Sequence, residues 1–135
     1  MSFSAFLYKF KDRNIDTVPW NEVEKFAKQY GHLGLGVGGY EITFDDEIIA
    51  DVVDVQGDPE NGLSGFSLNR PIECDETYDF IYTALKDFGM IFFDQEYEQA
   101  YALKDIGSDI PENLLENFGG VITVIKNKNE IWNNS

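Results

Sequence analysis

Short apolar runs, several of them alternating with polar residues, predict a series of β-strands. Alternation places successive side chains on opposite faces of a sheet, as a half-buried strand requires. The predicted strands cover residues 3–10, 40–44, 48–55, 63–68, 90–93, 98–103 and 121–125. Turn-forming residues separate several of them, most clearly the Asp-Pro-Glu-Asn-Gly run at 58–62. An acidic turn at 45–47 is expected to join two of the strands into a hairpin.

A different period, near 3.6 residues, predicts three helices. They are expected at residues 19–30 and 76–88, with a short third helix after Asp109. The first helix is expected to end at Gly31, and the second to begin at an Asp75 N-cap. Asp109 and Glu112 have the spacing of a capping box, which predicts the start of the third helix.

The order of these elements decides the fold class, because several strands follow one another without intervening helices. A doubly wound parallel sheet needs a helix after nearly every strand, so this order favours antiparallel pairing. We therefore predict an α+β fold, a mostly antiparallel sheet with about three helices packed on one face in a single pair of layers. No internal repeat or long linker interrupts the chain, so residues 1–135 are expected to form one globular domain.

A glycine-rich run at residues 34–39 (GLGVGG) superficially suggests a phosphate-binding loop. A dinucleotide fingerprint must leave a strand and open a helix, so that the phosphate meets the helix N-terminus. Here the run follows a predicted helix and leads into a predicted strand, and no Walker lysine follows it. We interpret residues 32–39 as a flexible or glycine-kinked connection, packed closely against another element.

Charge narrows the range of partners. The chain of 135 residues has 25 acidic residues against 10 Lys and Arg, a formal net charge of −15 at pH 7. This charge repels nucleic-acid phosphates and anionic membranes, so we expect neither as a partner. No apolar stretch approaches the roughly 18 residues of a transmembrane helix, and the N-terminal apolar run is too short for a signal peptide. We expect a cytoplasmic protein.

Negative charge concentrates between residues 29 and 69, where no Lys or Arg occurs. Eight acidic residues lie in that interval: Glu41, Asp45, Asp46, Glu47, Asp51, Asp54, Asp58 and Glu60. A strong local negative potential speeds encounter with a basic partner. The candidate partner-binding residues are Asp45, Asp46, Glu47, Asp51 and Asp54. The alternative is that the same charges only keep the surface solvated.

Patterns that indicate catalysis or metal binding are missing from the sequence. Residues 54–58 lack the alternating oxygen ligands and the distant Glu of an EF-hand loop. The acidic turn at 45–47 could hold magnesium, but no phosphate-binding element accompanies it. The one histidine, His32, and the one cysteine, Cys74, have no nucleophile motif around them. We predict no catalytic residue, metal or cofactor, and no enzymatic activity.

Two segments resemble a known family. Residues 65–71 (GFSLNRP) contain the end of a predicted strand, and residues 88–95 (FGMIFFDQ) contain a short apolar strand that ends in Asp-Gln. Together with the opening Met-Ser-Phe-Ser and the aromatic strand after it, they are similar to small bacterial proteins that include immunity proteins of contact-dependent inhibition and type VI secretion systems. The resemblance covers about half of the chain and rests on structural residues. It implies a toxin-binding protein and carries over no functional residue.

One function and two alternatives follow. We expect an immunity protein that neutralises a cognate bacterial toxin domain by protein–protein contact, with its acidic surface against a basic face of the toxin. The first alternative is a small regulatory or adaptor domain whose contact surface is apolar. The second is an enzyme that uses carboxylates, with or without a divalent metal. The oligomeric state stays open.

Overall fold

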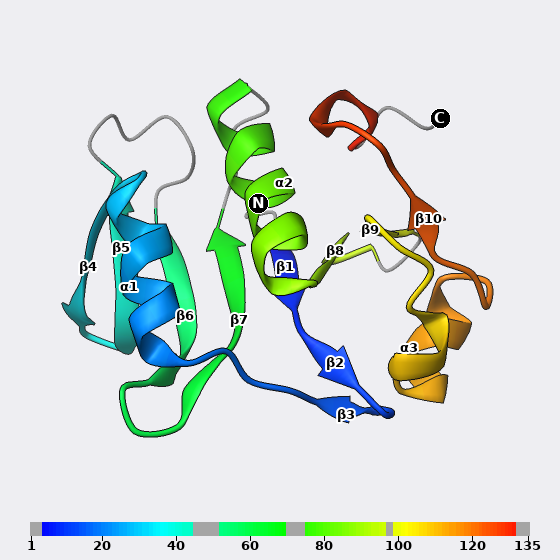
Figure 1. The fold of residues 1–135 in the computed structure, drawn as a ribbon, viewed down its shortest axis with the longest axis horizontal. Coiled ribbons are helices and arrows are strands. Elements are labelled where there is room, and N and C mark those ends of the chain that lie inside the picture. The colour runs from blue at the N-terminus through cyan, green and yellow to red at the C-terminus, as the bar shows by residue number, and fades with distance from the viewer. Residues whose placement is uncertain (1–3, 45–51, 70–74, 97–98, 132–135) are drawn as a thin grey trace.

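The computed structural model describes residues 4–44, 52–69, 75–96 and 99–131. An eight-stranded sheet runs through it in the order β10-β9-β8-β1-β7-β6-β5-β4, and a separate two-stranded hairpin joins β2 to β3 (Figure 1). Neighbouring strands are antiparallel except for β9 and β10, which are parallel. The predicted α+β class, with a mostly antiparallel sheet and three helices, is confirmed, and the sheet is larger than the sequence implied.

The elements alternate between long stretches of strand and single helices. The strands are β1 (Ser4–Tyr8), β2 (Phe10–Lys11), β3 (Asn14–Ile15), β4 (Gly31–Gly36), β5 (Gly39–Phe44), β6 (Val52–Asp58), β7 (Gly62–Asn69), β8 (Ile91–Asp94), β9 (Ala100–Ala102) and β10 (Thr123–Val124). The helices are α1 (Trp20–Lys28), α2 (Asp75–Phe88) and α3 (Glu112–Asn117), with 3-10 turns η1 (Gly107–Asp109) and η2 (Lys128–Glu130).

Strand β1 occupies the middle of the sheet, although it is the first strand of the chain. It pairs with β7 on one side and with β8 on the other. Its side chains alternate between the two faces, since Ala5 and Leu7 belong to the main core and Phe6 and Tyr8 to a second cluster.

The helices cover the two faces of the sheet unequally. α1 and α2 lie side by side over one face, in front of the strands in Figure 1. On β8, Phe92 belongs to the core beneath these helices, and its neighbour Phe93 points to the opposite face. There the Phe93 ring lies 5.3 Å from the ring of Phe118, the residue that ends α3. The expectation of helices on one face thus describes α1 and α2, and α3 packs on the other face.

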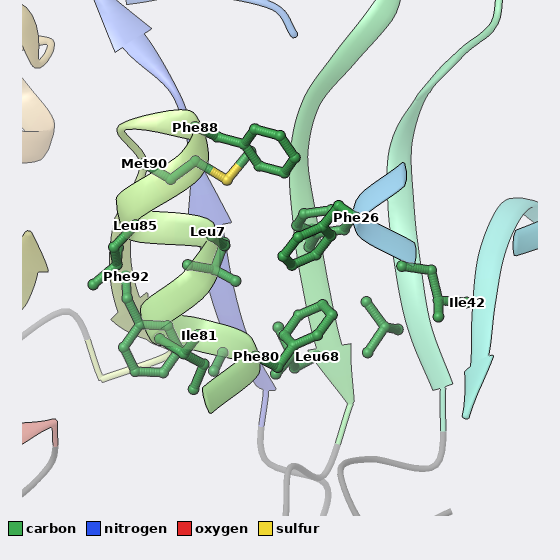
Figure 2. Packing of buried hydrophobic residues seen from close by; sticks show 14 of the residues in the cluster. Leu7, Phe26, Ile42, Leu68, Phe80, Ile81, Leu85, Phe88, Met90 and Phe92 are labelled. Atoms are coloured by element: carbon green, nitrogen blue, oxygen red, sulfur yellow. The ribbon is translucent and has the colours of Figure 1, made fainter. Parts of the chain in front are cut away.

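Aromatic rings fill the space between α1, α2 and the sheet. Phe26 of α1 is 2 % exposed, and its ring lies between α2 and β7 (Figure 2). The ring centroid of Phe26 is 5.0 Å from those of Phe80 and Phe88 on α2, and 5.6 Å from that of Phe66 on β7. These tilted and edge-on contacts are the arrangements that aromatic pairs prefer. Phe26 therefore links α1, α2 and β7.

A polar contact also ties α1 to α2. The hydroxyl of Tyr30, just after α1, donates a hydrogen bond to Asp79 Oδ2 at 3.0 Å and lies 3.1 Å from Thr83 Oγ1. Burial, with a further contribution from the charge of Asp79, raises the pKa of Tyr30 to about 12, above the value of 10.0 for a free tyrosine. The neutral phenol is therefore favoured in the folded protein.

This pKa predicts a loss of stability in alkaline solution. Below pH 10 the phenol of Tyr30 is neutral in both the folded and the unfolded chain. Its contribution to the free energy of unfolding is therefore fully present there. Between pH 10 and about 12 the phenol loses its proton in the unfolded chain but keeps it in the folded chain. Deprotonation favours the unfolded chain, so the contribution of Tyr30 to stability is lost over this range. Because the ring is only half-buried, we expect a loss of about 1 kcal/mol rather than the full value of the shift. Urea unfolding from pH 8 to 11.5 should show a shallower decline in the Tyr30→Phe variant, and parallel declines would contradict the prediction.

Strand β4 corrects the interpretation of residues 32–39 as a connection. Residues Gly31–Gly36 form a strand that pairs with β5 over six consecutive residue pairs. Close packing, which the small residues suggested, is present: a side chain at Gly31 would collide with the backbone of Thr43 and Phe44. The glycines therefore permit a close strand pair instead of interrupting it.

One end of each of the three helices differs from the sequence-based expectation. α1 ends with Gln29 as its C-cap, and Gly31 is already the first residue of β4. The predicted capping box of α3 is wrong, because Asp109 lies in η1 and Pro111 is the N-cap. The Asp109 carboxylate instead accepts a hydrogen bond from the backbone N–H of Asp12, 3.1 Å away. Asp75, the predicted N-cap of α2, is its first residue.

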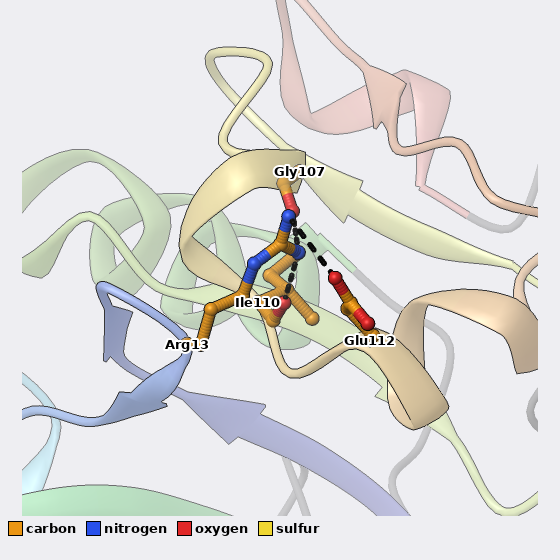
Figure 3. Close-up of polar contacts among 4 residues, drawn as sticks. All are labelled: Arg13, Gly107, Ile110 and Glu112. Atoms are coloured by element: carbon orange, nitrogen blue, oxygen red, sulfur yellow. Dashed lines mark hydrogen bonds and ion pairs between the residues drawn. The ribbon is translucent and has the colours of Figure 1, made fainter.

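The β2–β3 hairpin holds the segment before α3 in place. Its two turn residues, Asp12 and Arg13, both have positive φ angles, 53° and 72°. Arg13 Nη1 donates to the carbonyl oxygens of Gly107 at 3.1 Å and Ile110 at 2.7 Å, and Nη2 lies 4.0 Å from Glu112 Oε1 (Figure 3). One arginine thus fastens a turn near the start of the chain to a segment about ninety residues later.

Candidate functional site

The sheet face away from α1 and α2 carries polar side chains over strands β4 to β7. Ile42, Val53, Val55 and Phe66 on these strands belong to the core beneath the helices, so the residues between them point the other way. The described members of this group are His32, Glu41, Thr43, Asp54, Gln56, Ser67 and Asn69, which we call the outer face. Most of its side chains are exposed or half-buried. The outer face therefore offers a polar surface to a partner.

Two acidic residues are opposite each other on the outer face. Glu41 of β5 and Asp54 of β6 are paired residues in the antiparallel ladder. Side chains paired in this way have Cβ atoms about 5 Å apart, and like charges there destabilise the sheet. Within the described part of the chain the ion pairs are Lys9–Asp16 and Arg13–Glu112, so neither Glu41 nor Asp54 has a cation beside it. Among the described residues, the pair therefore adds two negative charges to the outer face with no cation beside them.

Hydrogen bonds fix several side chains of the outer face. Asn69 Nδ2 donates to Asp54 Oδ2 at 3.0 Å, and Gln56 Nε2 donates to Ser67 Oγ at 3.3 Å. Ser4 Oγ, on β1, donates to Asn69 Oδ1 at 3.5 Å. Asp54 is thereby oriented by a neutral donor that leaves its charge in place. A partner would meet a carboxylate that needs little rearrangement.

The sequence-predicted binding residues divide into two groups. Asp54 lies on the outer face, half-buried and bonded to Asn69. Asp45, Asp46, Glu47 and Asp51 lie outside the described residues, in the sequence that joins β5 to β6. Pairing of β5 with β6 confirms the expected hairpin.

Glu41 was not among the predicted binding residues, yet it lies beside Asp54. Alternation within the strand 40–44 was the available signal, because it places Glu41 on the polar face of the same hairpin. The strand register, which places Glu41 opposite Asp54, could not be predicted from the sequence.

Two other acids serve local structure. The backbone and side-chain N–H groups of Asn61 bond to Asp58 and hold the pKa of that carboxyl below its usual value. The backbone N–H groups of Lys126 and Asn127 have the same effect on the pKa of Glu130. These carboxylates stabilise a turn and the start of η2. Both carboxylates thus accept hydrogen bonds from neighbouring residues of the same loop.

The described residues show no arrangement typical of a metal centre. Among them, no group of three or more His, Cys, Asp or Glu side chains is placed to hold a metal ion. His32 lies on the outer face next to Gly34, and Cys74 falls outside the described residues. In residues 4–44, 52–69, 75–96 and 99–131 no helix is long and apolar enough to span a bilayer.

A cleft of about 440 Å³ lies elsewhere, between α1 and the C-terminal end of α2. Its charged lining is mixed, with Lys9 and Lys25 facing the same space as Glu22 and Asp87. Opposite charges in one open cleft favour no single class of charged ligand, so the outer face is the stronger candidate. Comparison of the chain with protein-family models, with curated proteins and with solved structures finds no match.

Proposed function

We propose that this protein is a non-catalytic binding protein that neutralises a basic partner, in the manner of an immunity protein bound to its cognate bacterial toxin domain. The observation that carries the proposal is the paired carboxylates of Glu41 and Asp54 on the outer face, which have no cation beside them among the described residues. The resemblance of residues 65–71 and 88–95 to immunity proteins supports the choice of partner class.

The energetics of the pair favour a basic partner. Like charges opposed across two strands destabilise the folded protein, and a Lys or Arg from a partner would offset that effect. The net charge of −15 adds long-range attraction, which raises the association rate with a basic domain and weakens as salt is added. Binding of this kind blocks a toxin by covering its surface, and it needs no catalytic group.

The outer face can be tested by reversing its charge. The double variant Glu41→Lys/Asp54→Lys should associate with the basic domain encoded beside this gene at least about tenfold more slowly at low salt, because charge steers the encounter. The matched control is Glu24→Lys/Glu116→Lys, which changes the net charge equally at exposed positions on α1 and α3. Stopped-flow association over a salt series measures both. An equal loss in the two variants would reject the outer face, and no binding by any neighbouring gene product would reject the immunity role.

The acids between β5 and β6 need a separate variant. Lys substitutions at Asp45, Asp46 and Glu47 together should weaken toxin binding and reduce its salt dependence, because rim charges act mainly on the association rate. Asp51 belongs to the same proposed contact and is tested alone as Asp51→Asn. Titration calorimetry and association kinetics across salt concentrations are the measurements. Unchanged affinity and rate would remove these four residues from the contact.

A further inference from the structure

Strand β4 is an open edge of the sheet. It is the last strand in the order, and within residues 4–44, 52–69, 75–96 and 99–131 it pairs with β5 on one side only. Edge strands usually carry charges, proline or a bulge, which prevent another strand from pairing with them. β4 and the turn after it, residues 31–39, contain no charged residue and no proline, and the pairing with β5 shows no register shift. No strand of the described residues pairs with its outer edge, so a further strand could pair there.

Apolar side chains are exposed at one end of this edge. Leu35 is 74 % exposed and Val37, in the turn, is fully exposed. Large exposed apolar side chains on an edge strand are typical of a surface that pairs with another chain. Side chains of an added strand would cover these exposed apolar side chains.

A carboxylate reaches across β4 toward the open edge. The Oε1 and Oε2 atoms of Glu41 stand 2.6 and 2.7 Å from the position that a Cβ on Gly36 would occupy. Glu41 belongs to β5, so its side chain extends over the neighbouring strand on the outer face. Because Gly34 and Gly36 have no side chains, nothing on those residues separates this carboxylate from a strand added at the edge.

We propose that β4 binds an extended basic segment of the partner protein as an additional strand. Main-chain hydrogen bonds to β4 would supply affinity, and a Lys or Arg beside Gly36 would reach the Glu41 carboxylate and supply specificity. This deepens the proposed function and rests on it for the existence of a basic partner. The inference gives that partner a binding mode, strand addition, and a site, the β4 edge.

Charge decides against a second copy of the chain as the occupant. Pairing of two β4 strands would add no positive charge near the Glu41 carboxylate of either copy. It would also join two chains that each carry a net charge of −15. Like charges across paired strands destabilise the pair, whereas a basic segment is attracted by the same groups.

The test uses a synthetic seven-residue peptide that alternates lysine with valine. We expect it to bind the full chain and to slow amide hydrogen exchange in β4, because an added strand protects the open edge. The control peptide has the same sequence with its internal amides N-methylated, which keeps the charge and removes the main-chain donors. Glu41→Gln should weaken binding of the first peptide by up to about fivefold. The matched control Glu116→Gln, on α3, should leave binding unchanged.

The outcomes are distinct. Equal binding of the methylated peptide, protection outside β4, or no binding up to millimolar peptide would each overturn the strand-addition site. β4 protection that rises with protein concentration in the absence of peptide would assign the edge to self-association instead. Since the peptide test needs no toxin, it can succeed where the neighbouring gene products fail to bind, and the two proposals can therefore fail separately.

Discussion

Replacing Phe26 with alanine is expected to lower the free energy of unfolding by about 3–5 kcal/mol. The Phe26 ring is 2 % exposed and lies within 5.6 Å of the rings of Phe66, Phe80 and Phe88, centroid to centroid. Alanine removes the ring from a space enclosed by three elements, and the surrounding backbone can close only part of the cavity. A domain is usually stable by about 5–15 kcal/mol, so one such change removes a large share of the total.

Two further variants separate packing from other effects of the Phe26 change. Phe26→Leu keeps most of the volume and should cost less than about 1.5 kcal/mol if it repacks as volume-conserving changes do. Lys28→Ala, exposed on the same helix, should change stability by less than about 0.5 kcal/mol. Urea unfolding followed by tryptophan fluorescence measures all three. If Phe26→Ala lowered the free energy of unfolding no more than Lys28→Ala does, the packing of Phe26 between α1, α2 and β7 would be contradicted.

Replacing Arg13 with alanine is expected to cost about 2 kcal/mol and to loosen the segment from η1 to α3. Hydrogen bonds from a charged donor contribute more than neutral ones, and Arg13 makes two, to the carbonyls of Gly107 and Ile110. Partial exposure of the side chain keeps the value well below that of a buried pair. Hydrogen exchange of residues 107–118 should speed up more than that of α1.

A glycine at the same position separates the side-chain bonds from the backbone. Arg13 has a φ of 72°, a conformation that costs an ordinary residue about 1 kcal/mol and costs glycine little. Arg13→Gly loses the same hydrogen bonds as Arg13→Ala, but it should be about 1 kcal/mol more stable. If the two variants unfolded at the same urea concentration, backbone conformation would contribute nothing at this turn.

Local patterns predicted elements well where each element carries its own signal. α1 and α2 have apolar side chains at helical spacing, and the strand at 63–68 alternates beside a strong turn, so all three appear close to their predicted bounds. β4 was missed because its glycines are unfavourable in an isolated strand. It forms because β5 pairs with it and because small residues such as Gly31 let the two backbones approach closely. That stabilisation comes from a neighbour and has no local signal.

The candidate site shows the same division. Composition and turn residues predicted the acidic hairpin, with Asp54 on its second strand. The pairing of β5 with β6 agrees with that prediction. Glu41 belongs to the candidate site for two reasons. The strand register places it opposite Asp54, and its carboxylate lies over Gly36, which has no side chain. Neither relation follows from the order of residues alone, because each depends on which strands become neighbours in the sheet.

The central position of β1 affects how the chain reaches its native state. Ser4 is paired with Asn69, and its backbone N–H bonds to Gln95, 91 residues away in sequence. β1 is made before both of its neighbours, so it can pair on either side only after β7 or β8 has been made. Meanwhile β4 to β7 can form a meander from neighbours alone. Contacts this distant in sequence slow folding toward the range of about milliseconds to seconds, with insertion of β1 between β7 and β8 as the expected slow step.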